Sequence, residues 1–245
     1  MRVMLVGDSW GCGEWNFNSS GILHPGLEQY LREDGHEVHN ISRGSISNLD
    51  IVHRISDYYQ RHNKQSLDLI LVFQTEYSRD FKHNKMQEDF GVNDWENLKE
   101  IKDLQNQWIE RFYFRLSEIS IRFSVPIKII GGCSDTIYFD DMSKDYPGCD
   151  IVCQSFTNLI LFDDDRISDP VFSWYSKSSA DLVEKLYKIL PMESVNNLVN
   201  EIDRGFEREC LLKENPTFFY PDGKHPNRIG HRILFDFLKS QKILD

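Results

Sequence analysis

The stretch Val3-Met4-Leu5-Val6-Gly7-Asp8-Ser9 decides the fold of this chain. Its four consecutive apolar residues are typical of a strand that is buried on both faces, as strands are in the middle of a parallel sheet. Gly7 ends the apolar run, and Asp8 and Ser9 follow directly. The stretch therefore predicts a buried first strand whose carboxyl end presents a serine hydroxyl.

Apolar runs alternate with helix-like patterns along the rest of the chain. We expect strands at residues 2–6, 37–41, 67–73 and 126–130, and a fifth strand or buried segment within 149–161. We expect helices at residues 25–33, 46–62, 95–123, 181–190, 195–212 and 226–239. Because the connections are long enough to cross over between parallel strands, the pattern predicts an α/β fold, a three-layer α/β/α sandwich with a central parallel sheet.

The predicted strands end in small or polar residues. Each of four apolar runs leads into one of them: Ser9, Gly44, Gln74 and Gly131. The carboxyl ends of parallel strands meet at one edge of a sheet, and sites in such folds form there. We therefore expect these residues along one rim.

One domain accounts for the whole chain. Its 245 residues are enough for a single α/β domain with its own core, and no Pro/Gly/Ser-rich linker divides it. Residues 80–95 and 132–175 are expected as irregular insertions, because they are polar, aromatic and weakly patterned. The prediction is thus a single domain over 1–245.

Composition excludes several classes of partner. A net charge of −11 argues against the basic face that nucleic acid or an anionic membrane requires. No apolar run approaches the ~20 residues of a membrane span, and the first apolar run is too short for a signal peptide. The cysteines lack a Cys-x-x-Cys spacing, which favours reduced thiols. We expect a cytoplasmic protein without metal or cofactor.

A second informative stretch is Asp222-Gly223-Lys224-His225-Pro226-Asn227. A serine hydroxyl needs a base within hydrogen-bond reach, and the base needs a partner that fixes its tautomer. A turn carrying Asp222 and His225 can aim both side chains at one point. Ser9, His225 and Asp222 together are the components of an acyl-transfer triad.

The two stretches resemble motif blocks of the SGNH (GDSL) hydrolase superfamily. That family has Gly-Asp-Ser after its first strand and Asp-x-x-His just before its last helix. Its second block contains a glycine, and residues 40–48 of this chain, Asn-Ile-Ser-Arg-Gly-Ser-Ile-Ser-Asn, are similar to it. The first fifty residues also resemble SGNH-like proteins encoded by tailed phages.

The resemblance implies a function for each matching residue. Ser9 would be the nucleophile, His225 the base and Asp222 the residue that orients it. The oxyanion hole would use the backbone N–H groups of Ser9 and Gly44, since glycine lets the backbone approach a substrate closely. His231, six residues beyond His225, is expected to be structural.

The third block departs from the family pattern. The family has Gly-x-Asn-Asp there, whereas this chain has Phe-Gln-Thr-Glu at 73–76. Loss of one oxyanion donor costs about 3–4 kcal/mol in the transition state. Gln74 carries the same amide on a longer stem and is the expected donor. Thr75 with its hydroxyl, another residue, or no third donor are the alternatives.

Two further side chains near these motifs have open alternatives. Trp10 is expected either to line a substrate pocket or to pack in the core. Arg79 is expected either to face an anionic substrate group or to lie in solvent. The substrate that the resemblance implies is a small acyl ester, such as an O-acetylated sugar. The alternative is an SGNH-like glycan-binding or interaction protein with little or no activity, which the missing asparagine favours.

Overall fold

The structure is a computed structural model that describes residues 1–16, 21–62, 66–75, 98–132, 136, 142–166 and 225–245. The predicted helices at 181–190 and 195–212 and the expected insertion at 80–95 lie outside these residues. Asp222 and Arg79 lie outside them as well. The predictions for these segments stay predictions.

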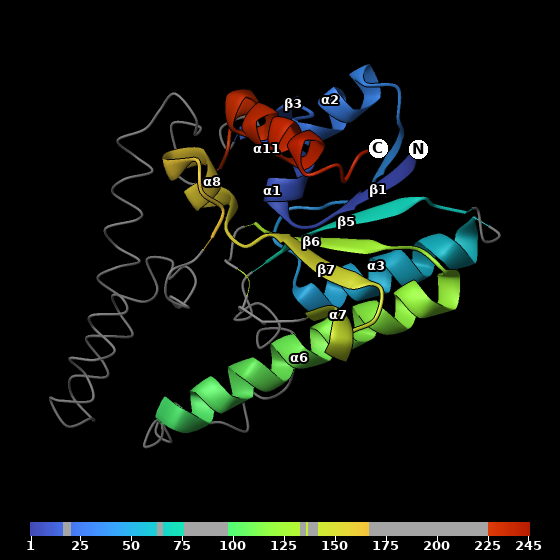
Figure 1. Cartoon of the computed structure of the whole chain (residues 1–245), viewed down its shortest axis with the longest axis vertical. Coiled ribbons are helices and arrows are strands. Elements are labelled where there is room, and N and C mark those ends of the chain that lie inside the picture. The colour runs from blue at the N-terminus through green and yellow to red at the C-terminus, as the bar shows by residue number, and fades with distance from the viewer. Residues whose placement is uncertain (17–20, 63–65, 76–97, 133–135, 137–141, 167–224) are drawn as a thin grey trace, which may run out of the picture.

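A five-stranded parallel sheet forms the centre of the fold (Figure 1). Its strands are β4 (Glu37–Asn40), β1 (Arg2–Val6), β5 (Leu69–Gln74), β6 (Ile127–Gly131) and β7 (Cys149–Cys153), in that order across the sheet. β1 pairs with β4 on one side and β5 on the other, so Val3 lies level with both Val38 and Leu69. The strand order reverses at β1, and the predicted α/β fold is confirmed.

The sheet separates two apolar cores. Val3 and Leu5 of β1 face the first core, and Met4 and Val6 face the second. This alternation follows from the two-residue period of a strand. All four side chains are fully buried, as the sequence pattern of β1 predicts.

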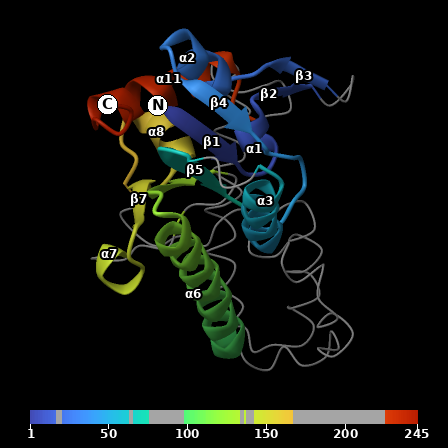
Figure 2. The ribbon, with the colours of Figure 1, turned by 90° about the vertical axis from the view of Figure 1, so that its right-hand side faces the viewer.

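Helices cover both faces of the sheet (Figure 2). The first core lies beneath α2 (Leu27–Glu33), α8 (Phe156–Phe162) and α11 (Arg228–Ser240). The second lies beneath α3 (Asn48–Arg61), α6 (Leu98–Phe123) and the short α7 (Met142–Asp145). The chain therefore forms the expected three layers.

Capping residues fix where the helices begin. Ser47 and Asp50 form a capping box that starts α3, two residues later than the pattern predicts. Asn227 caps α11 by accepting hydrogen bonds from the N–H groups of Ile229 and Gly230. This cap starts α11 at Arg228, three residues after His225.

Several short elements were not predicted. They are the helices α1 (Ser9–Cys12), α7 and α8 and the antiparallel pair β2 (Glu14–Asn16) and β3 (Gly21–His24). Part of the expected insertion at 132–175 is also regular, since β7 and α8 lie within it. Ser155 caps α8 by accepting a hydrogen bond from the N–H of Asn158. Among the described residues we find no helix with the length and apolar character needed to span a membrane.

His231 is a buried histidine in α11. Its side chain is fully buried and packs edge-on against Phe156, 5.6 Å between ring centroids. Gly26 has a φ of 60°, and a Cβ there would lie 2.7 Å from the His231 ring. Burial lowers the pKa of His231 from 6.5 to about 4, so the imidazole is neutral in the folded protein.

This buried imidazole predicts a pH-dependent loss of stability. The unfolded chain binds a proton near pH 6.5 and the folded chain only near pH 4, so stability from neutral His231 is present above pH 6.5 and is lost as the pH falls toward 4. The loss should total about 3 kcal/mol. Chemical denaturation of wild type and His231→Leu at several pH values measures it. Parallel curves for the two proteins over this range would contradict the prediction.

Candidate active site

Ser9 lies where the chain leaves β1. Asp8 caps α1 by accepting a hydrogen bond from the N–H of Trp10 at 3.0 Å, and Ser9 is the first residue of that helix. Gly7 lets the end of β1 lie close against β5, because a Cβ at that position would lie only 2.5 Å from Cβ of Phe73. The turn holds Ser9 at the point where the strand order reverses, the usual ligand position in such sheets.

His225 contacts Ser9 directly. Its Nε2 lies 2.8 Å from Oγ of Ser9, although 216 residues separate the two in sequence. Both residues are buried, with 7% and 8% of their surface exposed. In a shielded site a hydrogen bond from the serine hydroxyl to imidazole Nε2 is the geometry of a nucleophile and its base. The structure thus brings together two of the three predicted triad residues.

Gly44 lies at the same edge, in the turn after β4. Ser45 has a φ of 63°, which turns the chain sharply there. Burial raises the pKa of the Cys12 thiol to about 12, and a backbone hydrogen bond from Gly44 opposes the rise. The backbone of Gly44 thus lies beside Cys12 of α1, the helix that begins at Ser9. The high pKa also makes Cys12 a poor rival nucleophile.

A buried hydrogen-bond network joins three strand exits. Thr75 donates its hydroxyl to Asp8 at 2.9 Å. Asn48 accepts from the N–H of Thr75 and donates to its carbonyl, at 3.0 and 2.9 Å. The segments after β1, β4 and β5 are thus fixed to one another. The Thr75 hydroxyl donates to Asp8 within this network, and its role toward a substrate stays a prediction.

Gln74 ends β5 with a fully buried side chain. Its Oε1 accepts a hydrogen bond from the Tyr113 hydroxyl of α6 at 2.5 Å. This contact uses the amide oxygen and fixes the plane of the amide group. The sequence does not indicate this pair, because 39 residues separate Gln74 from Tyr113 and Tyr113 lies in an apolar helical pattern.

Trp10 packs in the core, the second of its two expected arrangements. Its ring is 1% exposed and meets Phe156 edge-on, 5.7 Å between centroids. The expected contact of Trp10 with a substrate is corrected accordingly, because the ring fills the first core beneath α1. Among the described residues no group of histidine, cysteine or acidic side chains could hold a metal ion.

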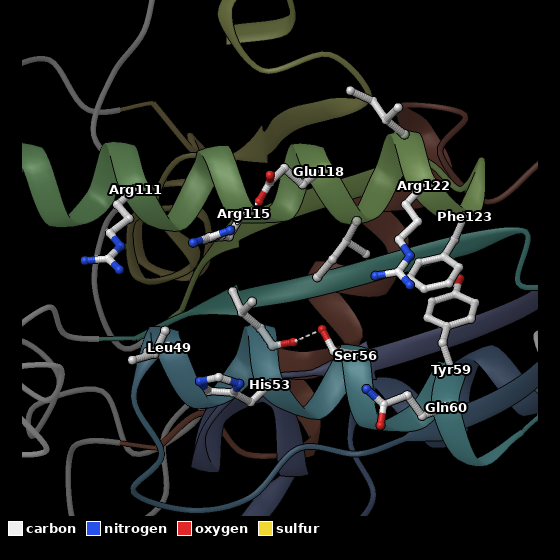
Figure 3. Close-up of a pocket in the computed structure, with 13 residues that line it drawn as sticks. Leu49, His53, Ser56, Tyr59, Gln60, Arg111, Arg115, Glu118, Arg122 and Phe123 are labelled. Carbon is white, nitrogen blue, oxygen red and sulfur yellow. Dashed lines mark hydrogen bonds and ion pairs between the residues drawn. The ribbon is translucent and has the colours of Figure 1, made fainter.

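A separate groove of about 980 Å³ lies between α3 and α6 (Figure 3). Arg111, Arg115 and Arg122 of α6 line one side, and His53 of α3 lies on the other. None of the predicted site residues lines it, and it lies in the helix layer opposite α11. It is therefore a surface feature apart from the Ser9–His225 pair.

Comparisons with known proteins give matches among solved structures only. No protein-family model matches the chain, and no curated protein matches it. The psychrotrophic esterase EstA from Pseudoalteromonas sp. is 11% identical, with a TM-score of 0.47, covering 100% of this chain and 99% of the other. A lipase/acylhydrolase from Enterococcus faecalis is 14% identical, with a TM-score of 0.41 and coverage of 100% and 96%.

An α/β hydrolase, LAE5, from the metagenome of Lake Arreo, Spain, is 15% identical, with a TM-score of 0.42 and coverage of 100% and 96%. This chain is thus similar in outline, over its whole length, to an esterase, a lipase/acylhydrolase and an α/β hydrolase.

Proposed function

We propose that this protein is a serine ester hydrolase of the SGNH type. The observation that carries the proposal is the 2.8 Å contact between His225 Nε2 and Ser9 Oγ. Two polar side chains from opposite ends of the chain are buried against each other at the reversal point of a parallel sheet. A purely structural serine in that turn does not require a histidine partner.

The reaction follows from this pair. Ser9 Oγ attacks the ester carbonyl carbon while its proton passes to His225 Nε2. The carbonyl oxygen becomes an oxyanion, for which the backbone N–H groups of Ser9 and Gly44 are the proposed donors. When the tetrahedral intermediate collapses, the alcohol leaves with the proton from His225, and Ser9 carries the acyl group. Water attacks the acyl-enzyme by the same steps and releases the acid.

Asp222 completes the proposed triad. Since Nε2 of His225 faces Ser9, Nδ1 is the ring nitrogen that an orienting carboxylate would bind in a triad. The Asp-x-x-His spacing, in which two residues lie between Asp222 and His225, supports this assignment. The proposed substrate is a small acyl ester, such as an O-acetylated sugar, as the resemblance of the motifs implies. The reaction as written consumes only the ester and water.

Gln74 is the proposed third oxyanion donor. Its amide carries N–H donors of the type that the family's asparagine has at this block, and the hydrogen bond from Tyr113 fixes the plane of the amide. A buried amide fixed in this way loses little conformational entropy when charge develops on the substrate.

A fluorophosphonate probe tests the nucleophile. It should add its phosphonyl group to Ser9 of wild type, since an activated serine attacks phosphorus as it attacks a carbonyl carbon. Intact-mass and peptide mass spectrometry locate the label, and Ser9→Ala should remain unlabelled. Folded wild-type protein that does not react would support the non-catalytic alternative.

Replacement of the base tests the pair. His225→Ala should lower kcat for p-nitrophenyl acetate hydrolysis by about 10³-fold or more. The exposed His53, on α3, supplies a matched control, and His53→Ala should keep wild-type turnover. Equal activity of His225→Ala and wild type would show that another group serves as the base.

The oxyanion assignment predicts a specific kinetic signature for Gln74. Gln74→Ala should lower kcat by about 10²-fold with little change in KM, because an oxyanion donor acts in the transition state. Tyr113→Phe should lower kcat less, since it loosens the amide without removing it. Steady-state kinetics on both variants check this. A raised KM with unchanged kcat would make Gln74 a ground-state contact instead.

A further inference from the structure

A buried carboxylate joins the two segments that carry Ser9 and His225. Glu14 is the first residue of β2 and is 7% exposed. Its Oε2 accepts hydrogen bonds from both the backbone N–H and the Nε of Arg228, at 3.0 and 2.8 Å. The Arg228 Nη2 reaches Oε1 at 3.4 Å. One side chain thus holds the first residue of α11 by its backbone and by its guanidinium.

The positions of these residues in the chain make the contact short and direct. Glu14 follows Ser9 by five residues, and Arg228 follows His225 by three. The single turn of α1 and Gly13 link Ser9 to Glu14, and Pro226 and Asn227 link His225 to Arg228. A hydrogen bond between Glu14 and Arg228 therefore limits how far Ser9 and His225 can separate.

The chemistry of the contact suits a fixed anchor. Hydrogen bonds in which the acceptor is ionised are shorter and stronger than neutral ones, and an anion is favoured at a helix N-terminus. Burial alone would raise the pKa of Glu14, but the hydrogen bonds from Arg228 outweigh it and lower the pKa below its ordinary value. Glu14 is thus ionised at neutral pH.

A second contact holds the same two segments one helical turn further along. His231 of α11 packs against Gly26, whose absent side chain would otherwise collide with the ring. The Gly26 backbone in turn lies against Gly13, since a Cβ on Gly26 would lie 2.8 Å from Cα of Gly13. Gly13 directly precedes Glu14. The first two turns of α11 are therefore seated on the segment that follows Ser9.

We infer that Glu14 is a positioning residue that holds His225 against Ser9. The inference rests on the proposed function, in which the 2.8 Å contact of these two side chains matters for turnover. Without Glu14, the start of α11 loses its anchor and the imidazole shifts from the serine. A displacement of about 1 Å in a catalytic contact costs about 10²-fold in rate.

The kinetic experiment compares four variants, each assayed well below its melting temperature. Glu14→Ala should lower kcat by about 10- to 100-fold with KM changed less than about twofold. Glu14→Gln keeps an oxygen that accepts from the Arg228 N–H, so its loss should be smaller. Arg228→Met also keeps that backbone bond and should lose less than Glu14→Ala.

Lys239→Met is the matched control. It breaks an ion pair of 2.7 Å between the far end of α11 and Asp34, so it loosens the same helix away from His225. Its kcat should stay within about twofold of wild type, because a displacement at the far end of α11 does not move His225 relative to Ser9. Equal losses for Glu14→Ala and Glu14→Gln would show that Glu14 acts through its charge alone, and an unchanged kcat in Glu14→Ala would overturn the inference.

A spectroscopic measurement tests the contact without using turnover. Proton–nitrogen correlation spectra report the ring nitrogens of His225, and Ser9→Ala should shift these signals in otherwise wild-type protein. In Glu14→Ala protein the additional Ser9→Ala change should leave them unmoved. One outcome is that Ser9→Ala shifts the His225 signals only when Glu14 is present, while wild type does not react with the fluorophosphonate probe. In that case Glu14 positions His225 as inferred, but the proposed hydrolase function is wrong. If wild type reacts and Glu14→Ala reacts equally fast, positioning fails and the function holds.

Discussion

The position of β1 between two parallel partners is the constraint on which the rest of the structure depends. β1 is hydrogen-bonded to β4 and β5, and its inward side chains are buried in two separate cores. Such a strand has no freedom to shift its register, because a slip of one residue would exchange the two faces. Its carboxyl end is therefore fixed to within a residue, and Ser9 with it.

Polar side chains also hold the ends of the neighbouring strands in place relative to the end of β1. Asp8, Thr75 and Asn48 link the exits of three strands through bonds of 2.9–3.0 Å, all in buried surroundings. A buried polar network of this kind is stable only when its members are satisfied together. The edge of the sheet that carries Ser9 is thus held by specific pairing and not by apolar packing alone.

Much of this architecture could be predicted from the sequence, for a physical reason. β1 and β5 are continuous apolar runs, which indicate strands, and α6 has a long helical period, which indicates a helix. Ser9 and His225 were predicted from their motifs, and the structure places them in contact.

The remaining features depend on contacts that no local pattern encodes. α1 has four residues and β2 has three, which is too short for any period to show. The pairing of Tyr113 with Gln74 and of Glu14 with Arg228 joins residues far apart in sequence. Trp10 had two expected arrangements, and only the packing of Phe156 beside it decides between them.

The contact across 216 residues also has a consequence for how the protein acquires its site during synthesis. N and C lie side by side in both ribbon views, and Met1 packs in the same core as Leu238 and Leu244 (Figures 1 and 2). β1 and Ser9 leave the ribosome before their partner His225, which follows 216 residues later. Contacts of such long sequence separation form late in folding, because the entropy of closing the loop must be overcome first. A nascent chain with its first strands in place therefore carries Ser9 without His225, and the contact between the two forms only when α11 docks.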